Sequence, residues 1–130
     1  MNNHQEVFST VTVSRNLQVW QKAHSLTLEI YRATKSFPRD ELYGLTNQMR
    51  RAAVSTTANI AEGSHRHHAN EFRHFLNISQ GSNEEVKYYL VLSRDLGLAS
   101  PNEAERLLKI ADEVGAMLYA LMKKVSLSES

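Results

Sequence analysis

The chain is 130 residues long and 42% of its residues are hydrophobic, which is enough for one domain around one core. It has 15 basic and 14 acidic side chains and no cysteine, which excludes disulfides, thiolate zinc sites and a strong overall field for nucleic acid or membranes. Residues 1–16 lack the apolar run of a signal peptide, and no later stretch is apolar enough to span a membrane. We therefore expect a cytoplasmic protein without a membrane partner.

The first predicted helix spans about residues 17–36. Apolar residues recur there at steps of four and three, which places them on one side of a helix. Pro38 ends the helix, because proline disfavours the helical conformation in the residue before it. The apolar stripe consists of Val19, Ala23, Leu26, Ile30, Ala33 and Phe37.

A second helix follows the turn at residues 38–44 and ends near Gly63, which suits a left-handed C-terminal cap. Two residues of its inner stripe, Ala52 and Thr56, are small, so a neighbouring helix can approach closely there. The stripe consists of Leu45, Met49, Ala52, Thr56 and Ile60.

A third helix is predicted from Ala69 to Gly97. Gly81 and Ser82 lie in its interior, where they could bend the helix or admit another backbone. Its inner stripe consists of Phe72, Phe75, Leu76, Ser79, Val86, Leu90 and Ser93.

The fourth helix has the clearest start signal in the sequence. Ser100 is placed as its N-cap, Pro101 stands at the first helical position, and Glu103 completes a capping box. The inner stripe then repeats at three and four residues and consists of Ala104, Leu107, Ala111, Val114, Leu118, Leu121 and Val125.

Short connections between amphipathic helices favour antiparallel neighbours. The sequence therefore predicts an all-α fold, an antiparallel up-and-down four-helix bundle over residues 17–125. The remaining residues, 1–16 and 126–130, are expected to form a flexible N-terminal tail and a C-terminal tail.

Five segments resemble the 23S rRNA intervening-sequence protein family in their order and spacing. They are VWQKA (19–23), YGLTNQMRRAAVS (43–55), NIAEG (59–63), EFRHFLNISQGS (71–82) and RDLGL (94–98). The resemblance implies a four-helix bundle that assembles into a cyclic homopentamer, in a family without an established enzymatic activity. The chain is also distantly similar to the accessory variability protein of diversity-generating retroelements, a basic pentamer that binds nucleic acid and a reverse transcriptase. It departs from the family pattern at His68, where serine is common.

The apolar surface of the first and third helices is wider than one bundle would bury. Residues 88–92 are all large and apolar or aromatic, so they point all the way round a helix and only some can face the core. Since monomers rarely leave such patches bare, we predict a homo-oligomer, with a broad monomer core as the alternative. The predicted interface consists of Trp20, Leu28, Tyr31, Tyr88, Val91 and Leu92.

Polar residues form a second stripe on the second helix. It consists of Gln48, Arg51, Ser55, Asn59 and Glu62. One interpretation is a buried network in which Arg51 pairs with Glu85 of the third helix, since buried charges are normally paired. The other is a site for RNA phosphate or another anion, held by Arg50 and Arg51. Arg50 points away from the stripe and is the freer of the two to contact a ligand.

Two Glu-x-x-His spacings, ending at His65 and His74, match an element that di-iron bundles use. The helix ends expected beside them, residues 17–23 and 117–124, contain no carboxylate, so this geometry does not suit a metal centre. We predict no metal and no cofactor, and interpret the histidines as a solvated turn that becomes more cationic as the pH falls. These histidines are His65, His67, His68 and His74.

The sequence contains no nucleophile motif and no phosphate-binding glycine loop, so we predict a protein that is not an enzyme and has no evident small-molecule substrate. Two functions stay open. One is an oligomeric structural or adaptor protein for protein or ribonucleoprotein partners. The other is an RNA- or DNA-binding protein with a basic patch repeated around a homopentameric ring. The patch would consist of Arg50, Arg66, Arg73, Lys123 and Lys124.

Overall fold

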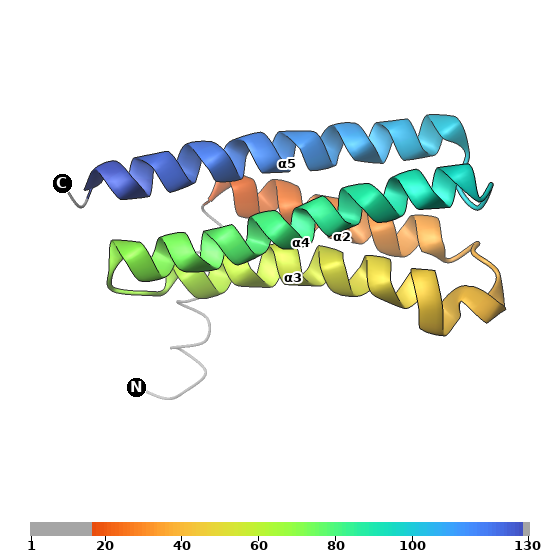
Figure 1. The fold of residues 1–130 in the computed structure, drawn as a ribbon, viewed down its shortest axis with the longest axis horizontal. Coiled ribbons are helices and arrows are strands. Elements are labelled where there is room, and N and C mark those ends of the chain that lie inside the picture. The colour runs from red at the N-terminus through yellow and green to blue at the C-terminus, as the bar shows by residue number, and fades with distance from the viewer. Residues whose placement is uncertain (1–16, 129–130) are drawn as a thin grey trace.

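The computed structural model describes residues 17–128, which form a bundle of four long helices (Figure 1). The helices are α2 (Gln18–Thr34), α3 (Asn47–Ser64), α4 (Ala69–Asp95) and α5 (Pro101–Ser128). Within this part of the chain there is no strand, and no helix is long and apolar enough to cross a membrane. The predicted all-α fold is confirmed, while the predicted N-terminal tail, residues 1–16, lies outside the described residues.

Neighbouring helices run in opposite directions. Between α4 and α5, the Gln80 side chain donates to the Gly115 carbonyl at 3.1 Å and the Asn83 side chain donates to the Ala111 carbonyl at 2.9 Å. Residue numbers thus rise along one helix as they fall along the other, and Figure 1 shows the same alternation through the bundle. Each of α2 and α4 packs against both α3 and α5, so α2 and α4 occupy opposite corners.

The predicted apolar stripes face the core of the bundle. Every stripe residue is buried except Ala33, Phe72, Phe75 and Leu121, which are half-buried. Burial of each large aliphatic side chain contributes about 1.5–3 kcal/mol, so this core is the main source of stability. Its largest buried side chains include Leu26, Ile30, Met49, Ile60, Leu76, Leu90, Leu107 and Leu118.

Helix α5 begins at Pro101 as the sequence predicts, but the predicted capping box is only half formed. The Glu103 amide donates to the Ser100 hydroxyl oxygen at 3.1 Å, which satisfies one amide at the helix start. The carboxylate of Glu103 does not return to the Ser100 amide, because it accepts from Arg106 at 2.9 Å instead. This charge-assisted bond lowers the pKa of Glu103. Arg106 also donates to Glu29 at 2.7 Å and so connects α5 to α2.

The prediction that Gly63 caps α3 in a left-handed conformation is wrong. The helix continues to Ser64, and the one positive φ among residues 17–128 belongs to Gly97, after α4. Gly63 is buried where α3 meets α4, and a Cβ atom there would lie 2.8 Å from the Phe75 Cβ atom and 2.9 Å from the Phe72 ring. The missing side chain therefore lets the two helices approach closely beside the turn that joins them.

Two other local features differ from the prediction, the interior of α4 at Gly81 and the end of α5. Helix α4 passes through Gly81 without interruption, and no neighbouring atom lies within 4 Å of the position of a Cβ atom at this residue. Helix α5 continues to Ser128, so residues 126–128 are helical although they were predicted to belong to the C-terminal tail. This extra turn is tied to the bundle, since Arg73 of α4 donates to the Ser126 hydroxyl at 3.2 Å.

The connection between α2 and α3 is folded rather than extended. It contains a 3₁₀ turn (Arg39–Glu41) followed by a wide helical turn (Leu42–Thr46). Gly44 departs from helical geometry there, with φ −106° and ψ −110°. Helix α3 therefore begins directly after a kink and lacks a regular first turn before it.

Candidate interaction surfaces

Apolar side chains are exposed on the outer faces of α2 and α4. Leu28 is 42% exposed and Tyr31 is 40% exposed on α2, and Tyr88 is 60% exposed on α4. The other three residues of the predicted interface, Trp20, Val91 and Leu92, are half-buried. All six thus keep some accessible surface in the protomer.

The run at residues 88–92 is divided between the core and the surface, as helical geometry requires. Leu90 is only 1% exposed and lies in the core, whereas Tyr88 points away from it. Because α2 and α4 are diagonal in the bundle, their apolar faces belong to opposite corners of it.

The predicted buried network on α3 is only partly present. Ser55 shares a hydrogen bond of 2.8 Å with Ser82 of α4, and the half-buried Asn59 side chain donates to the Ser55 carbonyl at 2.8 Å. The prediction that the four remaining members are buried is wrong, because smaller side chains beside them fill the contact between α3 and α4. The exposed members are Gln48, Arg51, Glu62 and Glu85.

Arg51 and Glu85 nevertheless lie at the same level of the bundle, as the antiparallel register predicts. Both line a shallow hollow with Gln48, Ser55 and Ser82. Arg51 and Glu85 form no ion pair in the described part of the chain, so the predicted pairing is wrong. Their side chains remain hydrated in the protomer, where exposed charges gain little from pairing.

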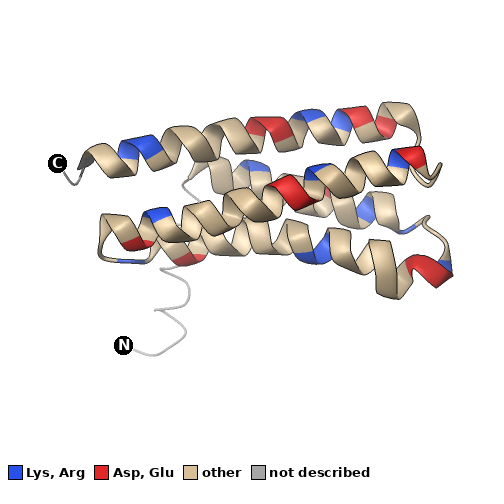
Figure 2. Cartoon of the chain, in the orientation of Figure 1, with Lys and Arg blue, Asp and Glu red and all other residues tan. Residues whose placement is uncertain are grey.

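Four of the five predicted nucleic-acid contacts gather at one end of the bundle. Arg66 lies in the turn between α3 and α4, Arg73 lies on the first turns of α4, and Lys123 and Lys124 lie near the end of α5. Figure 2 shows these basic segments close together at the end where α5 stops. Arg50 lies in the first turn of α3, towards the opposite end, and does not join them.

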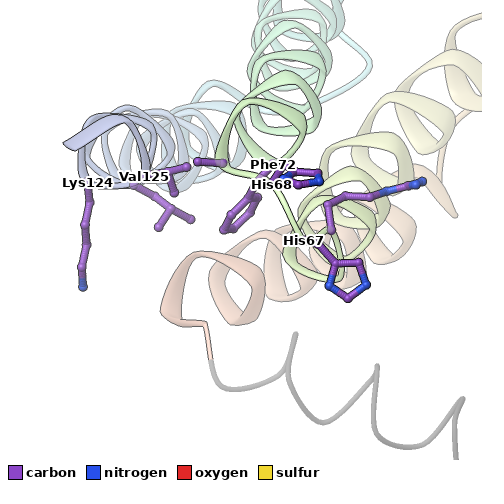
Figure 3. A pocket seen from close by; sticks show the side chains of 8 residues that line it. His67, His68, Phe72, Lys124 and Val125 are labelled. Carbon is purple, nitrogen blue, oxygen red and sulfur yellow. The ribbon is translucent and has the colours of Figure 1, made fainter. Parts of the chain in front are cut away.

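A hollow of about 510 Å³ opens within this basic end. Arg66, His67, His68 and Lys124 line it together with apolar residues that include Phe72. In Figure 3 the Phe72 ring lies between Val125 and His67, and the Lys124 and His67 side chains point away from the helices. No carboxylate is among the lining residues, so the hollow suits an anionic group.

The basic side chains at this end are partly held by neighbours. Arg66 forms an ion pair with Glu62 and its guanidinium lies 4.7 Å above the Phe75 ring. The ammonium of Lys123 lies 5.7 Å from the centre of the Tyr119 ring, which is within cation–π range. These contacts position the cations at the surface without burying them.

Comparison with known proteins assigns the fold to a family. The sequence model of the 23S rRNA-intervening sequence protein matches residues 15–120, which is most of the chain. The chain belongs to this family. A crystal structure of a protein of unknown function from the S23 ribosomal protein family of Bacteroides thetaiotaomicron is similar, with a TM-score of 0.73 and 21% identity. The similarity covers 81% of this chain and 98% of that one, and it supports the fold alone.

Among proteins with curated descriptions, none matches this member of the 23S rRNA-intervening sequence protein family. The distant similarity to the accessory variability protein stays a prediction. The departure at His68 has a local consequence, because His68 is the N-cap of α4 and forms no side-chain capping bond. The first amides of α4 thus lack the cap that serine would provide.

The histidines at the basic end lie in and beside the turn between α3 and α4. The His74 ring lies edge-on against the Phe75 ring, with 5.6 Å between the ring centres. Within residues 17–128, no three His, Cys, Asp or Glu side chains are grouped closely enough to hold a metal ion.

Sequence reasoning missed one polar layer inside this family member. Asn83 is fully buried between α4 and α5, and its side-chain oxygen and that of Gln80 have no hydrogen-bond partner among the described residues. The signal was present, since Asn83 lies four residues after Ser79 and three before Val86 on the inner stripe. A polar side chain at such a position is easily assigned to the surface by its chemistry alone.

Proposed function

We propose that this protein is a non-catalytic, self-assembling bundle that acts as a structural or adaptor platform for protein or ribonucleoprotein partners. The observation that supports the proposal is the pair of apolar faces on α2 and α4. A second protomer would cover the large apolar surfaces that are exposed at Tyr88, Leu28 and Tyr31.

The placement of the two faces favours a ring. When a surface binds the same surface of a second copy, the two copies form a closed dimer. When it binds a different surface of the second copy, each copy keeps one unused surface, so further subunits can add until a ring closes. The α2 and α4 faces lie at opposite corners of the bundle, so each protomer can bind one neighbour on each side. The family resemblance implies five subunits, and we adopt the homopentamer as the expected ring.

The assembly is tested by the mass of the full chain in solution. At about 10 µM, light scattering after gel filtration should give several times 14.8 kDa, because uncovered apolar patches favour association. Replacing Tyr88 with lysine should reduce the mass, since a lysine there would be desolvated without a partner. Tyr43 is 89% exposed in the connection outside both faces, so Tyr43→Lys is the matched control and should keep the wild-type mass.

A mixing experiment tests which faces meet. Leu28→Lys alters the α2 face and Tyr88→Lys alters the α4 face, so each variant keeps one intact face. Each variant alone should be monomeric, and an equimolar mixture should form a one-to-one dimer through the two intact faces. A wild-type monomer, or a Tyr88→Lys variant that dimerises alone, would contradict this arrangement.

Binding of RNA at the basic end is a second candidate function. Its support is the gathering of Arg66, Arg73, Lys123 and Lys124, which a ring would repeat in every subunit. Repetition converts weak contacts into multivalent binding. Two carboxylates, Glu62 and Glu71, lie at the same end of the bundle and reduce its net charge.

RNA binding is tested by its dependence on salt. The logarithm of the affinity for a single strand should fall with the logarithm of salt concentration at about −0.7 per phosphate contact. The double variant Lys123→Gln/Lys124→Gln should bind more weakly and with a shallower slope, while Arg32→Gln/Lys109→Gln removes as much charge elsewhere and should bind as wild type. No retention of RNA at low salt, or equal losses in both variants, would leave only the structural role.

A further inference from the structure

A second hollow is lined by residues of the α2–α3 connection. Figure 1 shows this connection at the end of the bundle opposite the basic end. Its volume is about 340 Å³. Lys35, Arg39 and Arg50 line it, together with Thr46 and a short apolar wall that includes Phe37. Three cationic residues thus line one small space that is independent of the Arg66–Lys124 region.

The charges in this hollow are not neutralised by the protein. No carboxylate lines it, and the side chains of Lys35 and Arg39 form no ion pair with any residue in the described range. Asp40 and Glu41 belong to the same connection but are not among the lining residues. The local charge is therefore positive although the whole chain is almost neutral.

Arg50 is held in a fixed orientation at the edge of the hollow. Its Nε–H donates to the Thr34 hydroxyl oxygen at 2.9 Å, and its guanidinium lies 4.7 Å above the Tyr31 ring. The Thr34 hydroxyl is itself fixed, because it donates to the Ile30 carbonyl at 2.8 Å. The two terminal nitrogens of Arg50 have no partner among the described residues, so a preorganised donor fork is available to a ligand.

Thr46 contributes an unused buried hydroxyl. The residue is 3% exposed, and its Oγ1 atom has no hydrogen-bond partner within the described part of the chain. Threonines inside the regular helices donate to the carbonyl four residues back, as Thr27, Thr34, Thr56 and Thr57 do. Thr46 has no such bond because the backbone departs from helical geometry at Gly44. A buried hydroxyl without a partner is costly, which favours a ligand that accepts from it. The Oγ1 atom is closed to solvent in the protomer, so the ligand must displace part of the hollow's wall to reach it.

We propose that the three cations and the Thr46 hydroxyl form a binding site for a phosphate group. A phosphate offers several acceptor oxygens, which match the Arg50 fork, the Lys35 ammonium and a hydroxyl donor better than a single carboxylate does. The apolar wall beside the cations would contact the organic part of a phosphate monoester. The same chemistry can be supplied by a free monoester or by a nucleic-acid strand, and the experiment separates these sources.

The test measures thermal unfolding of the full-length chain at constant ionic strength. Adenosine 5′-monophosphate is added as the monoester probe, and an RNA oligonucleotide without terminal phosphates as the diester probe. A ligand that binds the native state alone raises the melting temperature in a saturable manner. A rise with the nucleotide alone identifies a monoester site, and a rise with both probes identifies nucleic-acid phosphate as a ligand.

Three variants decide whether this hollow is responsible. Lys35→Gln/Arg39→Gln should weaken the apparent affinity about tenfold, since hydrogen bonds from charged groups are lost. Thr46→Val should weaken it several-fold while the ligand-free protein stays at least as stable, because an unsatisfied hydroxyl is replaced by a methyl group. Lys109→Gln neutralises an exposed lysine of α5 and should bind as wild type. Equal responses of all four proteins, or no saturable rise in wild type, would overturn the proposal.

Discussion

Replacing Leu90 with alanine should lower the free energy of unfolding by about 2–5 kcal/mol. Leu90 is 1% exposed, and it packs in the core where α4 faces the other helices. Alanine would lose the transfer free energy of the removed atoms and leave a cavity that a close-packed bundle refills only in part. Urea unfolding at a fixed protomer concentration measures the change, because unfolding and dissociation are linked in an oligomer.

Tyr88→Ala is the matched control for this prediction, since it truncates a side chain two residues away on the opposite side of α4. It should reduce the mass of the assembly. The free energy of unfolding of the separated protomer should stay within about 0.5 kcal/mol of wild type. If Tyr88→Ala destabilised the protomer as much as Leu90→Ala, the division of residues 88–92 between core and surface would be wrong.

Gly63→Ala should destabilise the protein by about 1–3 kcal/mol, although alanine is the better helix former. The added methyl carbon would lie 2.8 Å from the Phe75 Cβ atom and 3.2 Å from the Phe72 carbonyl oxygen. Both atoms are fixed by the backbone of α4, so the two helices must move apart. Thermal or urea unfolding of the variant against wild type measures this cost.

Gly81→Ala makes the same substitution where no neighbouring atom lies within 4 Å of the new carbon. Only the helix propensity changes there, so the variant should be about 0.5–1 kcal/mol more stable than wild type. Stabilisation by both substitutions would show that α3 and α4 do not approach as closely at Gly63 as described.

The helices and their inner faces could be predicted because periodic apolar residues and local end signals act over a few positions. The N-cap at Ser100 and the inner stripes of α2 and α5 follow from such short-range rules. The role of Gly63 could not be obtained in this way. A glycine near a helix end suits a left-handed cap or a close helix contact equally, and only the position of Phe72 and Phe75 decides between them.

The candidate sites were also harder to predict, because their residues come together only in the folded bundle. The sequence places Arg66, Arg73, Lys123 and Lys124 on three segments, and the up-and-down topology brings these ends together. Arg50 was grouped with them by residue type, but the bundle puts it at the other end, on Tyr31 and Thr34. Thr46 carried no signal, because its unused hydroxyl arises from the kink at Gly44.

The buried amides of Gln80 and Asn83 define how α4 and α5 are aligned along their length. Both side chains lie against Gly115, where a Cβ atom would come within 3.4 Å of each. If α5 slid by one turn, about 5.4 Å, in one direction, Tyr119 would come to this level and its ring would crowd the amides. The opposite slide would bring Ala111, whose methyl group would lie at ordinary contact distance. The glycine at this level thus excludes one of the alignments that the apolar repeat alone would allow.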